Sequence, residues 1–267
     1  MENIKKIAKM LDKLGFPAKP TKKQLLLYKE AIYKTCYTKK NPEILVLGAN
    51  PEIRDLCIKY NCSVTAVSPG SMALRAMSYL MKYKDSPKNK SIESNWLNMP
   101  LPNNSYDLVL TDIALTANPC GKHEQILKEV NRVLKPGGFF FLRTFDMLDH
   151  EKKPEPPEFL EELRNGEITK GDFLYLSARI PLDKHNNIDQ TKNLKLFESY
   201  CKEGKLTSQE IKIIKPYASD GVMSCPYRKD MIKRFEKFFD NISIKFATDP
   251  KIKTVQQNAL FFMRVKK

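Results

Sequence analysis

The hydrophobic positions between residues 43 and 146 alternate between two patterns. Short apolar or β-branched runs predict buried strands, and apolar residues at helical spacing predict helices. The runs place strands at residues 44–47, 63–67, 90–93, 106–113 and 139–145. The spaced patterns place helices at residues 52–60, 71–84 and 122–134. With short connections and right-handed crossovers, this order predicts an α/β fold with a doubly wound sheet.

The segments outside this region extend the pattern at both ends. Two amphipathic helices are expected before it, over residues 3–14 and 22–38, and together they form an N-terminal helical cap at residues 1–41. After residue 215 the alternation resumes. A helix is expected at residues 227–239, with strands at 242–247 and 258–265.

The alternation is interrupted after Phe145. Residues 149–157 are charged and rich in proline, which is typical of a surface connection, and residues 158–215 form several polar helical pieces. We interpret residues 149–215 as a helical insertion between the fifth and sixth strands, packed against the core. The core domain is then expected to comprise residues 42–148 and 216–267.

Composition excludes several classes of protein. No apolar run approaches the roughly 20 residues that a membrane span needs, and the first residues lack the apolar stretch of a secretion signal. We therefore expect a cytoplasmic protein without a membrane partner. The six cysteines form no C-x-x-C pair, so neither a zinc site nor a redox dithiol is predicted. No metal is expected.

The net charge of +15 is unevenly distributed. Residues 1–40 carry eleven lysines against three acids, whereas residues 41–150 carry twelve basic residues against eleven acids. This basic N-terminal segment, called the leader below, can bind phosphate backbones, but a lysine-rich solvated surface explains the same excess. Nucleic acid therefore remains an alternative partner rather than the favoured one.

The end of the first predicted strand carries the first candidate chemistry. Gly48 follows this strand directly, and Pro51 is suited to the first turn of the next helix. Ligands of doubly wound sheets bind beyond the carboxyl ends of the strands, where the strand order reverses. Glycine lets the backbone approach a ligand closely, and the helix N-terminus offers unpaired N–H groups. The turn therefore indicates a site for a nucleotide-like ligand.

The order of the features that follow points to a family. The segment Tyr106–Ile113 (YDLVLTDI) precedes a helix, and that helix ends in the turn Leu134–Gly138 (LKPGG) before an aromatic strand. Together with the Leu-Gly-x-x-Pro-Glu form of the first turn, this series resembles the class I S-adenosylmethionine-dependent methyltransferases. The resemblance covers about residues 43–146 and, more loosely, residues 227–266. It implies a seven-stranded Rossmann-like sheet whose last strand is antiparallel.

The resemblance also implies a cofactor, S-adenosyl-L-methionine, and positions that bind it. Gly48, Ala49 and Asn50 would lie beside its methionine part. Ser68 and Asn95 stand where the family usually has acids that bind the ribose hydroxyls and the adenine amino group. Two further positions are implied: Asp112 as a contact to the cofactor's amine or to the substrate, and Trp96 as a lining of the adenine site.

Methyl transfer from a sulfonium is an in-line displacement of a neutral leaving group, so orientation supplies much of the rate acceleration. A general base is required only when the acceptor arrives protonated. His123 follows the fourth predicted strand, and Asp146 and His150 follow the fifth. We name His123 and Asp146 as catalytic candidates and leave the catalytic residue open.

Several functions remain open at this point. The first is methyl transfer to a small molecule, supported by the insertion at residues 149–215, which we expect to serve as a substrate lid. The second is methyl transfer to RNA, supported by the basic leader but not by any aromatic tetrapeptide for a flipped base after strand four. The third is a cofactor-binding protein without catalysis, supported by the neutral Ser68 and Asn95. A nicotinamide dehydrogenase is disfavoured because the first turn lacks the G-x-G-x-x-G spacing. The sequence predicts no oligomeric state.

Overall fold

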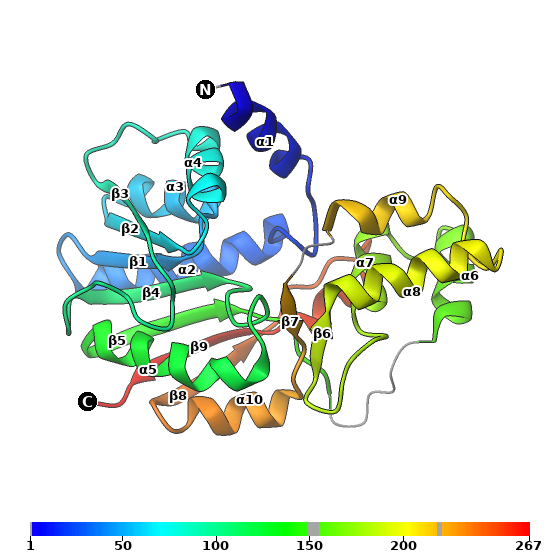
Figure 1. Cartoon of the computed structure of the whole chain (residues 1–267). Helices are drawn as coiled ribbons and strands as arrows, with labels where there is room; N and C mark the ends of the chain where they lie inside the picture. The colour runs from blue at the N-terminus through cyan, green and yellow to red at the C-terminus, as the bar shows by residue number, and fades with distance from the viewer. Residues whose placement is uncertain (1, 149–154, 218–220) are drawn as a thin grey trace.

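The computed structural model describes residues 2–148, 155–217 and 221–267. The core is a seven-stranded sheet with the order β3-β2-β1-β4-β5-β9-β8 (Figure 1). Its strands are β1 (Glu43–Leu47), β2 (Ser63–Ser68), β3 (Asn89–Glu93), β4 (Tyr106–Asp112), β5 (Leu134–Arg143), β8 (Phe239–Lys245) and β9 (Leu260–Val265). Only β9 runs antiparallel to its neighbours β5 and β8 among these described strands. The predicted doubly wound, Rossmann-like sheet with an antiparallel last strand is confirmed.

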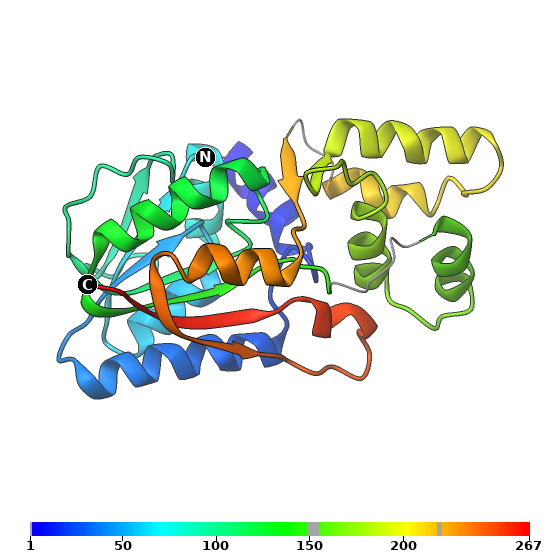
Figure 2. The same cartoon turned by 90° about the horizontal axis from the view of Figure 1, so that it is seen from below.

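Helices cover both faces of the sheet (Figures 1 and 2). One face carries α2 (Lys22–Thr38), α3 (Pro51–Lys59) and α4 (Ser71–Leu80), and the other carries α5 (His123–Val133) and α10 (Arg228–Phe235). Successive residues of β1 point to opposite faces, so Ile44 and Val46 pack with α2 and α3, and Leu45 and Leu47 with α5 and α10. This is why β1 is apolar throughout instead of alternating.

Local capping explains where two of these helices begin. Thr21 and Gln24 form a reciprocal capping box at the start of α2, with N–H to oxygen distances of 3.2 and 2.9 Å between the donor and acceptor atoms. At the start of α3 the Asn50 side chain accepts a hydrogen bond from the Ile53 N–H over 3.0 Å. Both caps lie in segments that connect to the carboxyl edge of the sheet, so they hold these connections in place.

The insertion after β5 forms a separate lobe beyond the carboxyl ends of the strands (Figure 2). Its helices are α6 (Pro156–Arg164), α7 (Lys170–Ala178), α8 (Gln190–Lys202) and α9 (Ile211–Ile214). They enclose an apolar cluster that includes Phe159, Phe173 and Phe197. This lobe agrees with the expected helical character of the insertion, although residues 149–154 of the Pro-rich connection lie outside the described residues.

A short two-stranded sheet crosses the expected C-terminal boundary of the insertion at residue 215. Strand β6 (Asn187–Asp189) pairs antiparallel with β7 (Val222–Ser224), which lies beyond residue 215. Three-residue strands carry too little periodicity to be recognised in a sequence, so neither was expected. The pairing attaches residues 222–224 to the insertion lobe as well as to the core chain that follows.

The leader reaches the carboxyl edge of the sheet. Helix α1 (Glu2–Asp12) packs against α4, and the segment after α1 passes toward the insertion lobe (Figure 1). Lys19 of this segment lies 3.2 Å from an Asp12 carboxylate oxygen and 3.7 Å from a Glu52 carboxylate oxygen of α3. The leader thus borders the edge at which the sequence predicts a ligand site.

Candidate functional site

The turn after β1 leaves open space beside its backbone. Gly48 has a φ of +115°, and a Cβ built on it would meet no heavy atom within 4 Å. Its N–H donates to the Val67 carbonyl of β2 over 2.8 Å, which holds the turn against the neighbouring strand. Positive φ at this angle favours glycine, and the open space permits close approach of a ligand. Ala49 follows in the same turn and is half-buried.

Three polar side chains meet between the ends of β1, β4 and β5. The Asn50 amide Nδ2 donates to Asp112 Oδ2 over 3.1 Å, while Asn50 Oδ1 caps α3. Arg143 Nε donates to Asp112 Oδ1 over 2.5 Å. Strands β1 and β4 are neighbours in the sheet where the winding reverses, which is the switch point of the fold. The structure therefore brings Gly48, Asn50 and Asp112 to one edge.

Arg143 also fastens the leader to this edge. Its guanidinium is fully buried and donates to the Pro17 carbonyl over 2.8 Å and to Asn258 Oδ1 over 3.3 Å. Tyr28 of α2 donates to the Thr111 carbonyl over 2.7 Å, and burial raises the pKa of its phenol well above the usual value, with the Asp112 charge adding to the effect. These bonds position the leader over the ends of β4 and β5.

The other predicted cofactor residues lie at the ends of β2 and β3. Ser68 ends β2, is 8% exposed and pairs in register with Glu93, the last residue of β3. Asn95 follows two residues later and is exposed, with its Oδ1 accepting from the Leu97 N–H over 3.0 Å. Trp96 is buried in the core, and its Nε1 donates to the Val67 carbonyl over 2.7 Å. Their contacts with a cofactor stay predictions.

His123 is enclosed by protein atoms. It is 1% exposed, and its Nε2 lies 2.9 Å from both the Leu115 carbonyl and Ser224 Oγ. Its Nδ1 lies 3.2 Å from Arg234 Nη1. Since a guanidinium can only donate, Nδ1 accepts and the ring proton belongs on Nε2. Burial, followed by the charge of Arg234, lowers the pKa of His123 to about 4. This environment suits a neutral structural imidazole, and a catalytic role stays a prediction without geometric support.

The Asp146 carboxylate is also hydrogen-bonded to other parts of the protein. It is fully buried, its Oδ2 accepts a hydrogen bond from Arg228 Nε, and its Oδ1 accepts from the Ala259 N–H over 3.3 Å. The ion pair joins the end of β5 to α10, so the carboxylate has a clear structural role. Its catalytic role likewise stays a prediction, and His150 lies outside the described residues.

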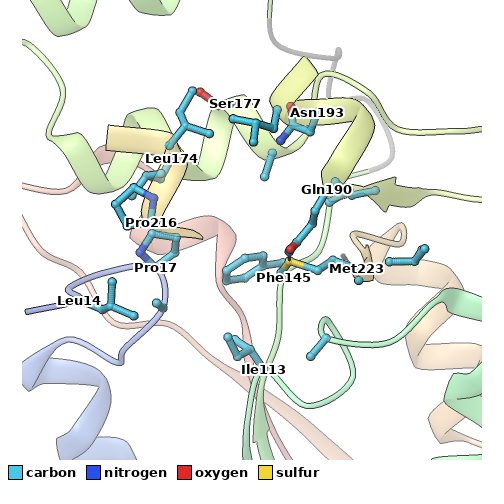
Figure 3. Close-up of a pocket in the computed structure, with 18 residues that line it drawn as sticks. Leu14, Pro17, Ile113, Phe145, Leu174, Ser177, Gln190, Asn193, Pro216 and Met223 are labelled. Carbon is cyan, nitrogen blue, oxygen red and sulfur yellow. Dashed lines mark hydrogen bonds between the residues drawn. The ribbon is translucent and has the colours of Figure 1, made fainter. Parts of the chain in front are cut away.

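A cavity of about 390 Å³ lies between the leader, the core and the insertion (Figure 3). Leu14 and Pro17 line one side, and Ile113 and Phe145, which follow β4 and β5, line the side nearest the sheet. Its volume falls in the range of about 300–1,000 Å³ that is typical of small-molecule sites. The insertion supplies most of the remaining wall through Leu174, Ser177, Ala178, Ile188, Gln190, Asn193, Leu194 and Ile214. The wall is completed by Ala18, Ala117, Pro216, Gly221, Val222 and Met223.

The described lining of this cavity is mostly apolar and carries no charged side chain. The sequence predicted a lid here but identified none of the insertion residues that line the cavity. The insertion's polar residues looked like ordinary surface positions, since helical periodicity alone does not show which face meets the core. Arg143 was also missed, although an arginine that ends the apolar run FFFL is a signal for a buried ion pair.

The residues present fit a nucleoside-containing cofactor at the Gly48 turn. The space where a Cβ would stand is open, and Glu52 Oε2, in the first turn of α3, is buried without a hydrogen-bond partner among the described residues. An unpaired carboxylate oxygen favours a ligand that brings a donor, such as an amine or hydroxyl. No group of three potential metal ligands (His, Cys, Asp or Glu) occurs in residues 2–148, 155–217 and 221–267. No helix within these ranges has the length and apolarity to traverse a bilayer.

Comparison with known proteins agrees with this geometry. Residues 48–142 match the methyltransferase-domain family. Over 75 residues the chain is 37% identical to a sterol 24-C-methyltransferase of Gibberella zeae, an alignment that covers 28% of this chain and 19% of that protein. The aligned part is therefore a small fraction of that relative.

Solved structures share the fold across nearly the whole chain. The N-methyltransferase NodS of Bradyrhizobium japonicum, solved with S-adenosyl-L-homocysteine, is 8% identical with a TM-score of 0.52, and the match covers 99% of this chain and 100% of NodS. A protein described as a putative Zn-dependent alcohol dehydrogenase from Rhodobacter sphaeroides is 11% identical with a TM-score of 0.62 and full coverage of both chains. At such identities these two likenesses show the fold alone. The match of residues 48–142 to a methyltransferase domain, the sheet order and the Gly48 turn together support a class I, Rossmann-like methyltransferase fold with S-adenosyl-L-methionine as its cofactor.

Proposed function

We propose that this protein transfers a methyl group from S-adenosylmethionine to a small, largely apolar acceptor held in the 390 Å³ cavity. The observation that carries the proposal is the uncharged cavity wall built jointly by the leader, the strand ends and the insertion. Ile113, in that wall, directly follows Asp112 at the end of β4. The acceptor site therefore adjoins the edge where Gly48 lies.

The chain's own residues suggest how the cofactor is held. Gly48 and Ala49 would border its methionine part, and Ser68 would bond the ribose. Asn95 and Trp96 would border the adenine. Glu52 Oε2 offers an additional acceptor for a ligand donor. The cofactor supplies an electrophilic methyl on a sulfonium.

The contribution of the protein is then orientation and exclusion of water. Arg143 holds the leader segment at Pro17, which itself lines the cavity, so this bond closes one side of the acceptor site. Holding two reactants in line can supply about 7–11 kcal/mol of the barrier reduction. The described lining contains no Asp, Glu, His, Cys, Lys or Tyr, so it supplies no general base. This favours an acceptor whose nucleophile needs no proton removed by the cavity wall.

RNA is the alternative acceptor, favoured by the eleven lysines of residues 1–40. A neutral, apolar cavity lacks the cations that a phosphate backbone requires. Filter binding with tRNA at low and physiological salt separates the two. Affinity that disappears at physiological salt would indicate charge attraction alone, whereas retained tight binding would favour the RNA alternative.

Titration calorimetry with S-adenosylmethionine and S-adenosylhomocysteine tests the proposal directly. We expect saturable binding of both, followed by turnover when pools of small metabolites are added with the cofactor. Absence of binding heat and of any thermal shift at millimolar cofactor would refute the proposed methyltransferase activity. Binding without turnover across broad pools would instead favour a regulatory, cofactor-binding protein.

A further inference from the structure

Two polar side chains in the apolar cavity each have an oxygen atom without a hydrogen-bond partner among the described residues. Ser177 of α7 is 1% exposed and Asn193 of α8 is 8% exposed, and both line the cavity. Within the described part of the chain, Ser177 Oγ and Asn193 Oδ1 are buried with no hydrogen bond. Figure 3 shows both residues on the insertion side of the cavity, opposite Ile113.

A carboxylate on the same helix as Ser177 shows the contrast. Asp172, also on α7, accepts four hydrogen bonds, two from Thr169 and two from Thr254, at donor–acceptor distances of 2.7 to 2.9 Å. A serine within a helix commonly donates to the carbonyl four residues earlier, as Ser78 does to Leu74 over 2.7 Å. Ser177 makes no such bond in the described structure. Leaving buried polar atoms unpaired destabilises a fold, so their presence in a ligand cavity indicates a ligand that pairs with them.

We propose that Ser177 and Asn193 bind a hydroxyl group at one end of an otherwise apolar acceptor. A hydroxyl donates one hydrogen bond and accepts two, so it can donate to the Asn193 carbonyl oxygen and accept from the Ser177 hydroxyl. The rest of the lining near these two residues, including Leu174, Ala178 and Leu194, suits an apolar body. The inference rests on the proposed function only in calling this molecule the methyl acceptor.

The placement also orients the acceptor. Ser177 and Asn193 belong to the insertion, whereas Ile113 and Phe145 lie where β4 and β5 end. A hydroxyl bound by the insertion is therefore held at the side of the cavity opposite the strand ends. The atom that receives the methyl group is then a different part of the molecule, nearer the Gly48 edge. Ser177 and Asn193 act as specificity residues rather than catalytic ones.

A matched pair of probes tests this site. The alcohol 2-naphthol and its methyl counterpart 2-methylnaphthalene have nearly the same shape and differ in the hydrogen-bonding group. Binding is measured from probe fluorescence with the wild-type protein, Ser177→Ala and Asn193→Leu. Because each hydrogen bond contributes severalfold in affinity, we expect the wild type to prefer the alcohol by about tenfold. Each variant should reduce that preference by about threefold or more and bind 2-methylnaphthalene at least as well.

Ser199→Ala provides the control, since it removes a hydroxyl from the same helix α8 at a residue that does not line the cavity. It should keep the wild-type preference. Equal affinity of the wild type for both probes, or no binding of either, overturns the inference. S-adenosylmethionine binding by calorimetry is measured on the same proteins without probe. Loss of cofactor binding there would refute the proposed function, whereas intact cofactor binding with no alcohol preference would refute only this site.

Discussion

The Arg143 guanidinium donates to the Asp112 carboxylate over 2.5 Å, and both side chains are buried, at 0% and 6% exposure. The pair joins the ends of β4 and β5, and the remaining guanidinium bonds reach Pro17 and Asn258. A buried ion pair costs desolvation of both charges, so removing one partner leaves the other charge unpaired. Through its bonds, Arg143 therefore links the switch point of the sheet to the leader and to the segment that leads into β9.

Arg143→Met is expected to destabilise the fold by about 3–5 kcal/mol, because it leaves Asp112 charged and buried. Lys245→Met is the matched control. Its 2.6 Å pair with Glu30 is partly exposed, at 30% and 42%, and such pairs contribute only about 0–1 kcal/mol. Urea denaturation of both variants measures the difference. Equal losses in the free energy of unfolding would show that burial does not make the Arg143 pair more important for stability than the exposed pair.

Gly48→Val should lower S-adenosylmethionine affinity by tenfold or more, because valine would fill the open space beside the turn. The same substitution at Gly166 is the control. Gly166 also has positive φ, +73°, and open surroundings, but it lies in the insertion after α6. Both variants should also lose stability through backbone strain, because a β-branched residue rarely adopts positive φ. Calorimetry should find altered affinity only at Gly48, and unchanged affinity there would mean that the turn does not cradle the cofactor.

His123 predicts a pH dependence of stability. Its folded pKa of about 4 lies below the ordinary value of 6.5, so the unfolded chain binds a proton more readily. Above pH 6.5 His123 is neutral in both states, so the fold keeps its full stability. As the pH falls from 6.5 toward 4, the unfolded state is protonated first and the free energy of unfolding drops by up to about 3 kcal/mol. His123→Gln should differ from the wild type in this pH window, with a stability gap that narrows as the pH falls.

The same variant tests the catalytic candidate. If His123 is structural, His123→Gln should retain turnover at temperatures well below its unfolding midpoint. Denaturant curves at pH 7.5, 6, 5 and 4 check the stability gap, and initial rates check catalysis. A fully folded but inactive variant would restore His123 as a general base, and parallel stability curves would contradict the lowered pKa.

Ser177→Ala is expected to raise the stability of the ligand-free protein by up to about 1 kcal/mol, because it removes a buried hydroxyl that has no partner in the described part of the chain. Ser78→Ala should do the opposite. Ser78 Oγ donates to the Leu74 carbonyl and accepts from Arg54 Nη1 over 2.8 Å, so its loss leaves the buried Arg54 short of a partner. Thermal melts of both variants decide the signs. A destabilised Ser177→Ala would show that its hydroxyl already has a structural role.

Much of the fold could be predicted from local patterns. The uninterrupted apolar run at residues 44–47 predicts a buried parallel strand, and the structure has β1 at Glu43–Leu47. The helix predicted at residues 71–84 ends earlier, at Leu80, where Met81 takes an extended conformation. The strand predicted at residues 139–145 instead begins at Leu134, since the LKPGG turn itself joins the sheet through pairing of Tyr106 with Leu134.

Fewer features of the candidate site than of the fold could be predicted from the sequence. Gly48 was predictable because a glycine between a strand and a helix is a local signal, and its positive φ agrees with that reading. The sequence offered His123 and Asp146 as candidates only, and in the structure each is hydrogen-bonded to an arginine more than eighty residues later, Arg234 and Arg228 respectively. No local pattern contains such distant partners.

The sequence by itself determined the order of strands and helices, the winding of the sheet and the glycine turn, because each depends on periodicity or backbone preference among close neighbours. Only the tertiary structure decided which polar groups are satisfied. Arg143 donates to Asp112 and Pro17, whereas Ser177 Oγ and Asn193 Oδ1 have no hydrogen-bond partner among the described residues. These outcomes arise where leader, core and insertion converge, and burial makes each pairing, or its absence, energetically significant.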